Sequence, residues 1–180
     1  MDVERFILYN LPSRSRYAFE VQKKKSINGN EVAMLKGIPP LISPDFMKTL
    51  LEMGHGDEIV IVNANFPAVS NARRLVRCDG STAVQVLEAV MRFFPLDTFV
   101  GKPVTLMDVA SGEKEPPAIW SEFQAVIKQN EPWVQDYETV NRNIFYERAR
   151  QAYAIVTTGE RRRYANIILK KGIIEPDVVV

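Results

Sequence analysis

The segment after Ser43 has the hydrophobic pattern of an amphipathic helix. Apolar side chains recur there every three or four positions, at Phe46, Met47, Leu50 and Leu51. Ser43 is a favoured N-cap and Pro44 a favoured first helical residue, so we expect a helix from Pro44 to about Gly54. Residues 58–62 then form a short apolar run rich in β-branched side chains. Such a run predicts a strand covered on both faces.

Predicted strands and helices alternate along the rest of the chain. The apolar runs and the turn residues between them predict strands at residues 75–77, 104–109, 153–157 and 167–169 and helices at residues 82–94, 117–128 and 144–152. This alternation is typical of an α/β layered fold. We therefore predict an α/β sandwich in which helices flank a central sheet.

Residues 1–33 do not share this alternating pattern. Lys23-Lys24-Lys25 runs into Ser26-Ile27-Asn28-Gly29-Asn30, a polar, turn-prone stretch that is typical of a linker. We predict an N-terminal extension over residues 1–33, whose role the pattern does not identify, and a single domain over residues 34–180.

Composition and charge narrow the classes of function. The 180 residues are 46% hydrophobic and 25% charged, as in ordinary globular proteins, and the formal net charge is +1. Such a balance produces no overall field toward nucleic acid or acidic lipid, and no apolar run approaches the roughly 20 residues of a membrane span. The N-terminus also lacks a secretory signal pattern. We expect a cytoplasmic protein that binds neither nucleic acid nor a membrane.

The content of cysteine and histidine argues against a metal site. Cys78 is the one cysteine and His55 the one histidine. A typical structural zinc site needs four cysteine or histidine ligands, and one cysteine cannot form an internal disulfide. The sequence also contains no glycine-rich phosphate loop and no nucleophile-elbow motif. We therefore expect no structural metal, and the motifs do not support nucleotide binding or serine-hydrolase chemistry.

His55 is a candidate acid/base residue. It lies between two glycines in the predicted turn from helix to strand, where a ligand has room to approach. Imidazole titrates near neutral pH, so it can both donate and accept a proton. The alternative is a polar turn residue after a glycine that caps the helix, which is the commoner role of a lone histidine. The spacing alone leaves both interpretations open.

Two further segments carry polar aromatic residues. Tyr146 and Glu147 can contribute a phenol and a carboxylate to a site, but Glu147 with Arg150 is also an ordinary i,i+3 pair on a helix surface. Arg161-Arg162-Arg163 precedes Tyr164. In a chain with almost no net charge, this arginine run more often faces solvent or a neighbouring subunit than nucleic acid.

Several separate motifs follow one another in collinear order over about residues 34–174. They include Met53-Gly54-His55-Gly56-Asp57-Glu58-Ile59, Asn65-Phe66-Pro67-Ala68, Phe145-Tyr146-Glu147-Arg148-Ala149 and Tyr164-Ala165-Asn166-Ile167-Ile168-Leu169-Lys170-Lys171-Gly172. These motifs resemble the RbsD/FucU family, in particular its branch that acts on L-fucose. The resemblance implies a sandwich fold and a homo-oligomer with sites near subunit contacts. It also implies a cofactor-free isomerase that interconverts the α and β anomers of L-fucose or a related monosaccharide.

The same resemblance implies roles for individual residues. His55 matches the family's catalytic histidine, and the positions expected to contact sugar are Asn63, Asp97, Arg142, Tyr146, Tyr164 and Asn166. The family usually has an aspartate where this chain has Asn63. An amide can bond a sugar hydroxyl but cannot accept a proton or stabilise an imidazolium. If that carboxylate takes part in proton transfer, Asn63→Asp should raise the rate.

Mutarotation requires the ring oxygen of the sugar to gain a proton while the anomeric hydroxyl loses one. We expect His55 to protonate the ring oxygen, with Tyr164 or a water molecule acting at the anomeric hydroxyl. Tyr146, Asn166 and Asp97 would then orient the sugar hydroxyls. Two alternatives remain at the level of the sequence: a ribose pyranase-type mutarotase, and a non-catalytic monosaccharide-binding or regulatory protein.

Overall fold

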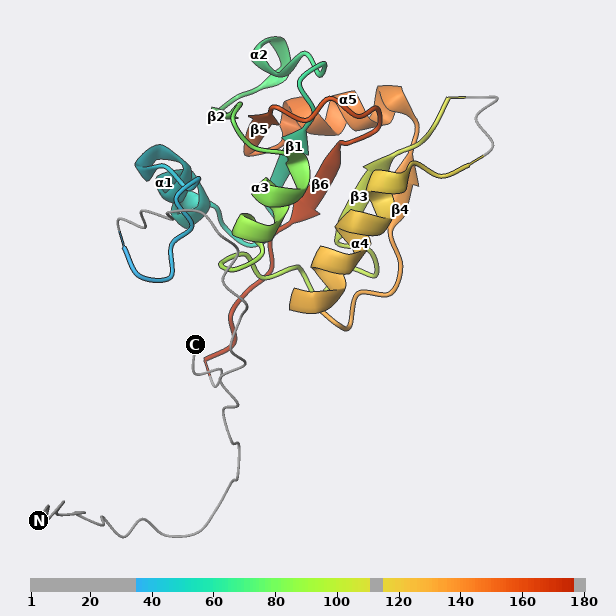
Figure 1. Cartoon of the computed structure of the whole chain (residues 1–180). Coiled ribbons are helices and arrows are strands. Elements are labelled where there is room, and N and C mark those ends of the chain that lie inside the picture. Colours follow the sequence, from blue (N-terminus) through green and yellow to red (C-terminus); the bar gives the residue numbers. More distant parts are fainter. Residues whose placement is uncertain (1–34, 111–114, 177–180) are drawn as a thin grey trace, which may run out of the picture. The chain divides into compact units, whose positions relative to one another are not determined.

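A single mixed sheet, flanked by helices, forms the centre of the computed structural model, which describes residues 35–110 and 115–176 (Figure 1). In chain order, the elements are α1 (Pro44–Glu52), β1 (Glu58–Val62), α2 (Ala68–Asn71), β2 (Leu75–Cys78), α3 (Ala83–Val90), β3 (Val104–Met107), α4 (Ala118–Asn130), β4 (Glu138–Val140), α5 (Arg142–Gln151), β5 (Ala154–Thr158) and β6 (Ile167–Lys170). The predicted extension over residues 1–33 lies outside the described residues.

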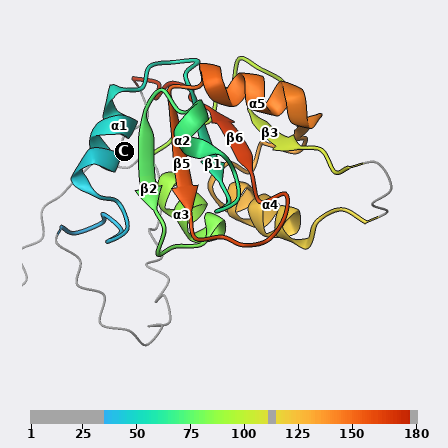
Figure 2. The ribbon, with the colours of Figure 1, turned by 90° about the horizontal axis from the view of Figure 1, so that it is seen from above.

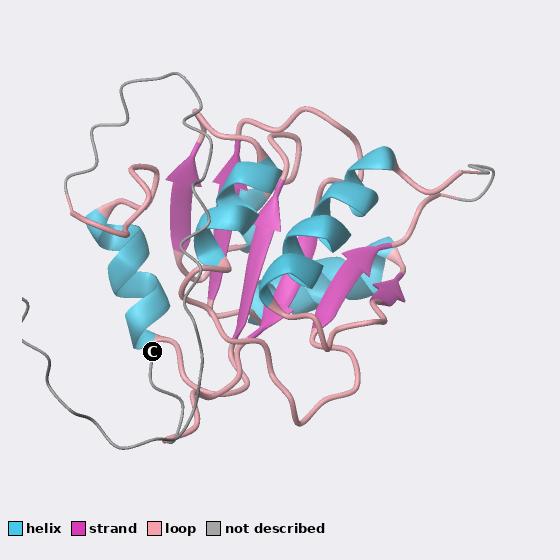
Figure 3. Cartoon of the chain, turned by 60° about the horizontal axis from the view of Figure 1, so that its bottom comes forward, coloured by secondary structure: helices cyan, strands magenta, loops and turns pink. Residues whose placement is uncertain are grey.

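The directions of the strands distinguish the two ends of the sheet. The order is β2-β5-β1-β6-β3-β4, and β6 runs antiparallel to both of its neighbours while the other pairs are parallel. Figure 3 shows the strands, coloured magenta, side by side. Five strands therefore end where β6 begins. We call this the carboxyl edge, and the opposite one the amino edge.

Alternate residues of the strands pack on opposite faces of the sheet. Ile59 and Ile61 of β1 belong to a core with α1, α3 and α4, whereas Val60 and Val62 belong to a second core with α2 and α5. Figure 2 shows α5 on one side of the sheet and α3 and α4 on the other. All four of these β1 side chains are fully buried. The continuous apolar run of β1 follows from this coverage of both faces.

The observed elements confirm the predicted α/β layered fold and most of the predicted boundaries. Helix α1 begins at Pro44, and the Ser43 hydroxyl accepts the Phe46 N–H at 3.2 Å. Helix α3 ends at Val90 rather than at residue 94, since the Phe93 N–H bonds back to the Val90 carbonyl in a tighter turn. The sequence did not indicate α2 or β4. Both are short, and the edge strand β4 buries none of its three residues.

No helix in residues 35–110 and 115–176 is long and apolar enough to cross a membrane.

Candidate active site

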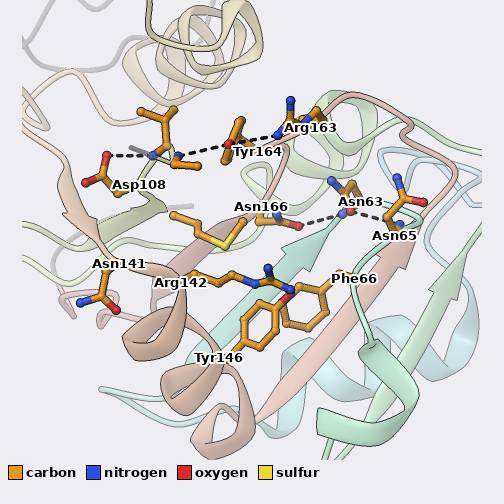
Figure 4. Close-up of a pocket in the computed structure, with 13 residues that line it drawn as sticks. Asn63, Asn65, Phe66, Asp108, Asn141, Arg142, Tyr146, Arg163, Tyr164 and Asn166 are labelled. Atoms are coloured by element: carbon orange, nitrogen blue, oxygen red, sulfur yellow. Dashed lines mark hydrogen bonds between the residues drawn. The ribbon is translucent and has the colours of Figure 1, made fainter. Parts of the chain in front are cut away.

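A cavity of about 620 Å³ opens at the carboxyl edge of the sheet. Its lining comes from the ends of β1 and β3, the start of α5 and the loop before β6. The lining residues are Asn63, Asn65, Phe66, Met107, Asp108, Val109, Ala110, Asn141, Arg142, Tyr146, Arg163, Tyr164 and Asn166. Figure 4 shows these side chains around a common space.

Strand polarity explains why polar residues gather at this place. Asn63 directly follows β1, Asp108 directly follows β3, and Asn141 directly follows β4. The carboxyl ends of neighbouring parallel strands meet at one edge of a sheet, which is where open α/β sheets usually bind ligands. Residues that are far apart in the sequence therefore line one cavity.

The loop before β6 contributes Tyr164 and Asn166. The Tyr164 hydroxyl accepts the Ala110 N–H at 3.1 Å, and the Asn166 side-chain oxygen accepts the Asn63 N–H at 3.1 Å. The first bond ties this loop to the segment after β3, and the second ties β6 to β1. Both side chains are thus held in place before any ligand binds, and pre-organised polar groups fix ligand orientation at low entropic cost.

An aromatic wall faces these polar groups. The Phe66 and Tyr146 rings meet edge to face with centroids 4.8 Å apart, and the Arg142 guanidinium lies 5.1 Å from the Tyr146 ring centroid (Figure 4). Phe66 is almost fully buried. A cavity with an apolar wall and several convergent hydrogen-bonding groups suits a small polyhydroxylated ligand, which has both C–H surfaces and hydroxyls.

His55 lies at the opposite, amino edge, in the turn that leads into β1. Its Nε2 is 3.1 Å from Asp97 Oδ1, and its ring centroid is 5.4 Å from that of Phe99. The five residues of β1 separate His55 from Asn63, which corresponds to about 17 Å at the rise of an extended strand. Within one chain, the histidine does not reach the cavity.

Asp97 orients the imidazole of His55. Burial alone would raise the pKa of the Asp97 carboxyl, but hydrogen bonds from the Phe99 N–H and from His55, with the charges of His55 and Lys170, hold this pKa below its usual range. An ionised carboxylate only accepts hydrogen bonds, so Nε2 must carry a proton. Nδ1 is therefore the nitrogen that can exchange a proton with a ligand.

Close backbone approach holds the Asp97 segment beside the His55 turn. A Cβ atom on Gly172 would lie 2.4 Å from the Leu96 carbonyl oxygen, so only glycine fits at this position. The Asp97 N–H donates to Lys170 O at 3.1 Å, and the Gly56 N–H donates to Lys171 O at 2.8 Å. The end of β6 thus places the Asp97 segment and the histidine turn in register.

Two other kinds of site find no support in residues 35–110 and 115–176. No group of three or more histidine, cysteine, aspartate or glutamate residues there is placed to hold a metal ion. Cys78 is buried, and its burial together with the neighbouring Asp79 raises the pKa of its thiol to about 11. A thiol that stays protonated at neutral pH is a poor nucleophile.

The model of the RbsD / FucU transport protein family matches residues 36–174. This chain belongs to the RbsD/FucU family. An L-fucose mutarotase of Actinobacillus pleuropneumoniae is 43% identical over 140 residues, which are 78% of this chain and 97% of the relative. An L-fucose mutarotase of Histophilus somni is 44% identical over 140 residues, which are again 78% of this chain and 97% of the relative.

Solved structures agree with this family membership. The fucose mutarotase of Streptococcus pneumoniae in complex with L-fucose has a TM-score of 0.73 and 46% identity, covering 78% of this chain and all of that one. Bacillus subtilis RbsD complexed with D-ribose has a TM-score of 0.58 and 20% identity, covering 74% of this chain and 95% of that one. The second likeness concerns the fold alone.

The structure divides the residues that the family resemblance suggested into two groups. The cavity brings together Asn63, Arg142, Tyr146, Tyr164 and Asn166. His55 and Asp97 form a separate pair at the amino edge, so Asp97 contacts the histidine and does not line the cavity. Sequence reasoning did not single out Asp108 or Ala110. Ala110 directly follows the strand predicted at residues 104–109, but Asp108 falls inside that prediction, because the observed β3 already ends at Met107.

Proposed function

We propose that this chain is a sugar mutarotase that interconverts the α and β anomers of L-fucose without a cofactor. The observation that carries the proposal is the cavity, since Tyr146, Tyr164, Asn166 and Arg142 converge there in a chain that is 46% identical to a fucose mutarotase solved with L-fucose. Four polar side chains and an aromatic wall can orient each hydroxyl of a monosaccharide. Asn63 Oδ1 can also accept a sugar hydroxyl, because an amide oxygen accepts two hydrogen bonds.

The acid/base group for this cavity comes, in our proposal, from a second copy of the chain. His55 projects from a surface with large exposed apolar side chains: Leu51 is 76% exposed, Phe99 68% and Ile174 57%. A contiguous apolar surface of this kind favours protein association. Docking this surface over the carboxyl edge of a neighbour would cover the cavity and bring an imidazole into it, giving a homo-oligomer.

The proton transfers follow from the two halves of the site. His55 Nδ1 of one copy, starting as the doubly protonated imidazolium, protonates the ring oxygen of the sugar bound to the other. The anomeric hydroxyl gives its proton either to a water molecule or to the Tyr164 hydroxyl oxygen, which passes its own proton to that water. The C1–O5 bond breaks and a carbonyl forms at C1. Rotation about the C1–C2 bond turns the other face of the carbonyl toward O5. The reverse transfers then close the ring as the other anomer.

NMR saturation transfer between the two anomers of L-fucose tests the proposal. We expect the protein to accelerate anomer exchange of L-fucose above the uncatalysed rate, and more than that of D-ribose or D-galactose. Binding of L-fucose without faster anomer exchange would favour a non-catalytic binding protein. Preferential acceleration with D-ribose would favour a ribose pyranase-type mutarotase.

A further inference from the structure

The Tyr164 backbone has an unusual conformation. Tyr164 has a φ of +59°, and within residues 35–110 and 115–176 it is the one residue other than glycine with a positive φ. Large L side chains seldom adopt this left-handed region, because Cβ then crowds the backbone. Glycine would meet no such crowding, but it would bring no phenol. Something in the surrounding structure must hold this conformation.

Two side-chain donors from distant parts of the chain form hydrogen bonds to backbone carbonyls of the loop around Tyr164. Asn63 Nδ2 donates to the Arg162 carbonyl at 3.0 Å, and Trp120 Nε1 donates to the Tyr164 carbonyl at 3.3 Å. Asn63 follows β1, whereas Trp120 belongs to α4. The two carbonyls lie two residues apart in the chain, so together they fix the backbone on both sides of the Arg163–Tyr164 peptide.

The orientation of the Asn63 amide is itself fixed. Its Oδ1 accepts the Asn65 N–H at 3.1 Å, so rotating the amide by half a turn would lose that bond as well as the one to Arg162. Asn63 is also buried, which leaves its side chain little freedom. An aspartate at this position would direct an acceptor oxygen at the Arg162 carbonyl oxygen. It cannot donate there while ionised.

We propose that Asn63 and Trp120 are positioning residues that hold Tyr164 in its left-handed conformation and thereby aim its phenol at the sugar. This inference rests on the role proposed above for Tyr164. The φ angle at Tyr164 sets the direction of its side chain, and its hydroxyl meets the Ala110 N–H at the cavity. The amide at position 63 is thus suited to this loop because its NH₂ group can donate to the Arg162 carbonyl. This proposal predicts the opposite of the sequence-based expectation, namely that a carboxylate at position 63 slows exchange.

The test uses Asn63→Asp and Trp120→Phe, each with a matched control. Asn130→Asp also removes an amide donor to a backbone carbonyl, that of Val126, and Trp133→Phe also removes an indole donor, here to Glu131. We expect the Asn63 and Trp120 variants to lower the exchange rate at saturating L-fucose by about tenfold, since small displacements of a reacting group are costly. Sugar affinity should change less than the rate, and the controls should match the wild type.

A double-mutant cycle with Tyr164→Phe separates positioning from general damage. If the two residues act through the phenol, neither variant should slow the Tyr164→Phe protein further. The Ala110 amide proton should also exchange faster with solvent in both variants, because its acceptor has moved. Equal losses with and without the phenol, or an Ala110 amide as protected as in the wild type, would overturn the inference.

A failure of the role proposed for the Tyr164 phenol gives a different result. If Tyr164→Phe alone exchanges anomers at the wild-type rate, the phenol has no catalytic role, and positioning by Asn63 and Trp120 for catalysis is overturned with it. If Tyr164→Phe slows exchange but the Asn63 and Trp120 variants do not, the proposed function stands and only the inference fails.

Discussion

The two edges of the sheet differ in shape and in chemistry. The carboxyl edge is hollow and polar, lined by side chains from segments that follow β1, β3 and β4 and precede β6. The amino edge carries a half-exposed histidine, held by a buried aspartate and surrounded by exposed apolar side chains. The carboxyl edge thus has polar groups that can bind and orient a ligand. The amino edge has an imidazole beside a mainly apolar cavity of about 820 Å³.

This difference is the basis of our proposal that the two edges function together across a contact between copies. A strand of five residues keeps the two edges of one chain about 17 Å apart, which is too far for proton transfer.

Removing the imidazole should have the largest effect. His55→Ala should lower anomer exchange by roughly 10² to 10⁴-fold, which is the usual contribution of a general acid–base group. The protein should stay folded, because the His55 side chain is 45% exposed and lies in a turn. Saturation transfer measures the rate and thermal unfolding checks the fold. A folded His55→Ala protein that exchanges anomers at the wild-type rate would refute the mechanism.

Mixing the His55→Ala and Tyr164→Phe proteins tests whether the site is shared. His55→Ala leaves the cavity intact, and Tyr164→Phe leaves the histidine intact. In a randomly reassembled equal mixture, about a quarter of sites would combine an intact histidine with an intact cavity from two different chains. We therefore expect about a quarter of the wild-type exchange rate after unfolding and refolding the two proteins together. A mixture no more active than its components, in oligomers shown to be mixed, would place the whole site in one chain.

Asp97→Asn should have an intermediate effect. The Phe99 N–H and His55 Nε2 both bond Asp97 Oδ1, and the oxygen of an asparagine can accept both hydrogen bonds. The substitution removes the negative charge that stabilises a protonated imidazole. We expect a loss of roughly tenfold to a hundredfold in exchange rate, part of the contribution of acid–base catalysis. Sugar affinity should change little, because Asp97 does not line the cavity. Weaker sugar binding with an unchanged rate would instead support direct contact between Asp97 and the sugar.

The sequence could predict the elements of this fold better than the arrangement of its site. Periodic apolar runs such as residues 58–62 indicate strands because burial on both faces leaves a direct trace in the sequence. The short edge strand β4 leaves no such trace. It pairs only with β3, and none of its side chains is buried.

The separation of His55 from the cavity depends on strand direction, which the apolar pattern does not encode. The sequence shows that His55 precedes a strand and that Asn63 follows it. It does not show which other segments meet at each end. The family resemblance pointed to Tyr164 and Asn166, but the left-handed backbone at Tyr164 and the donors that hold it, from the residue after β1 and from α4, arise only from tertiary contacts.

We expect the smallest effect on exchange from a change at Glu160, which bonds the loop before β6. Its buried carboxylate accepts hydrogen bonds from the Arg162 guanidinium and from the backbone N–H groups of Arg161 and Arg162. The hydrogen bonds from the Arg162 guanidinium hold the pKa of this carboxyl below its usual range, against the opposing effect of burial. An ionised Glu160 therefore stabilises the folded state.

The sign of the pH dependence follows from this lowered pKa. The unfolded chain takes up the Glu160 proton at a higher pH than the folded chain does, so the stabilisation is fully present above the ordinary carboxyl pKa of about 4. It is lost as the pH falls through the lower folded pKa.

Glu160→Gln should lower the free energy of unfolding by roughly 1–3 kcal/mol at neutral pH, as expected for hydrogen bonds to a charged group, and should flatten the acid side of the stability curve. Thermal unfolding between pH 7 and pH 3 measures both effects, with Glu88→Gln on the exposed face of α3 as the control. Exchange at neutral pH should fall only severalfold, because the bonds from Asn63 and Trp120 to the loop remain. A wild-type acid slope in the Glu160→Gln protein would show that this carboxylate does not stabilise the carboxyl edge through its charge.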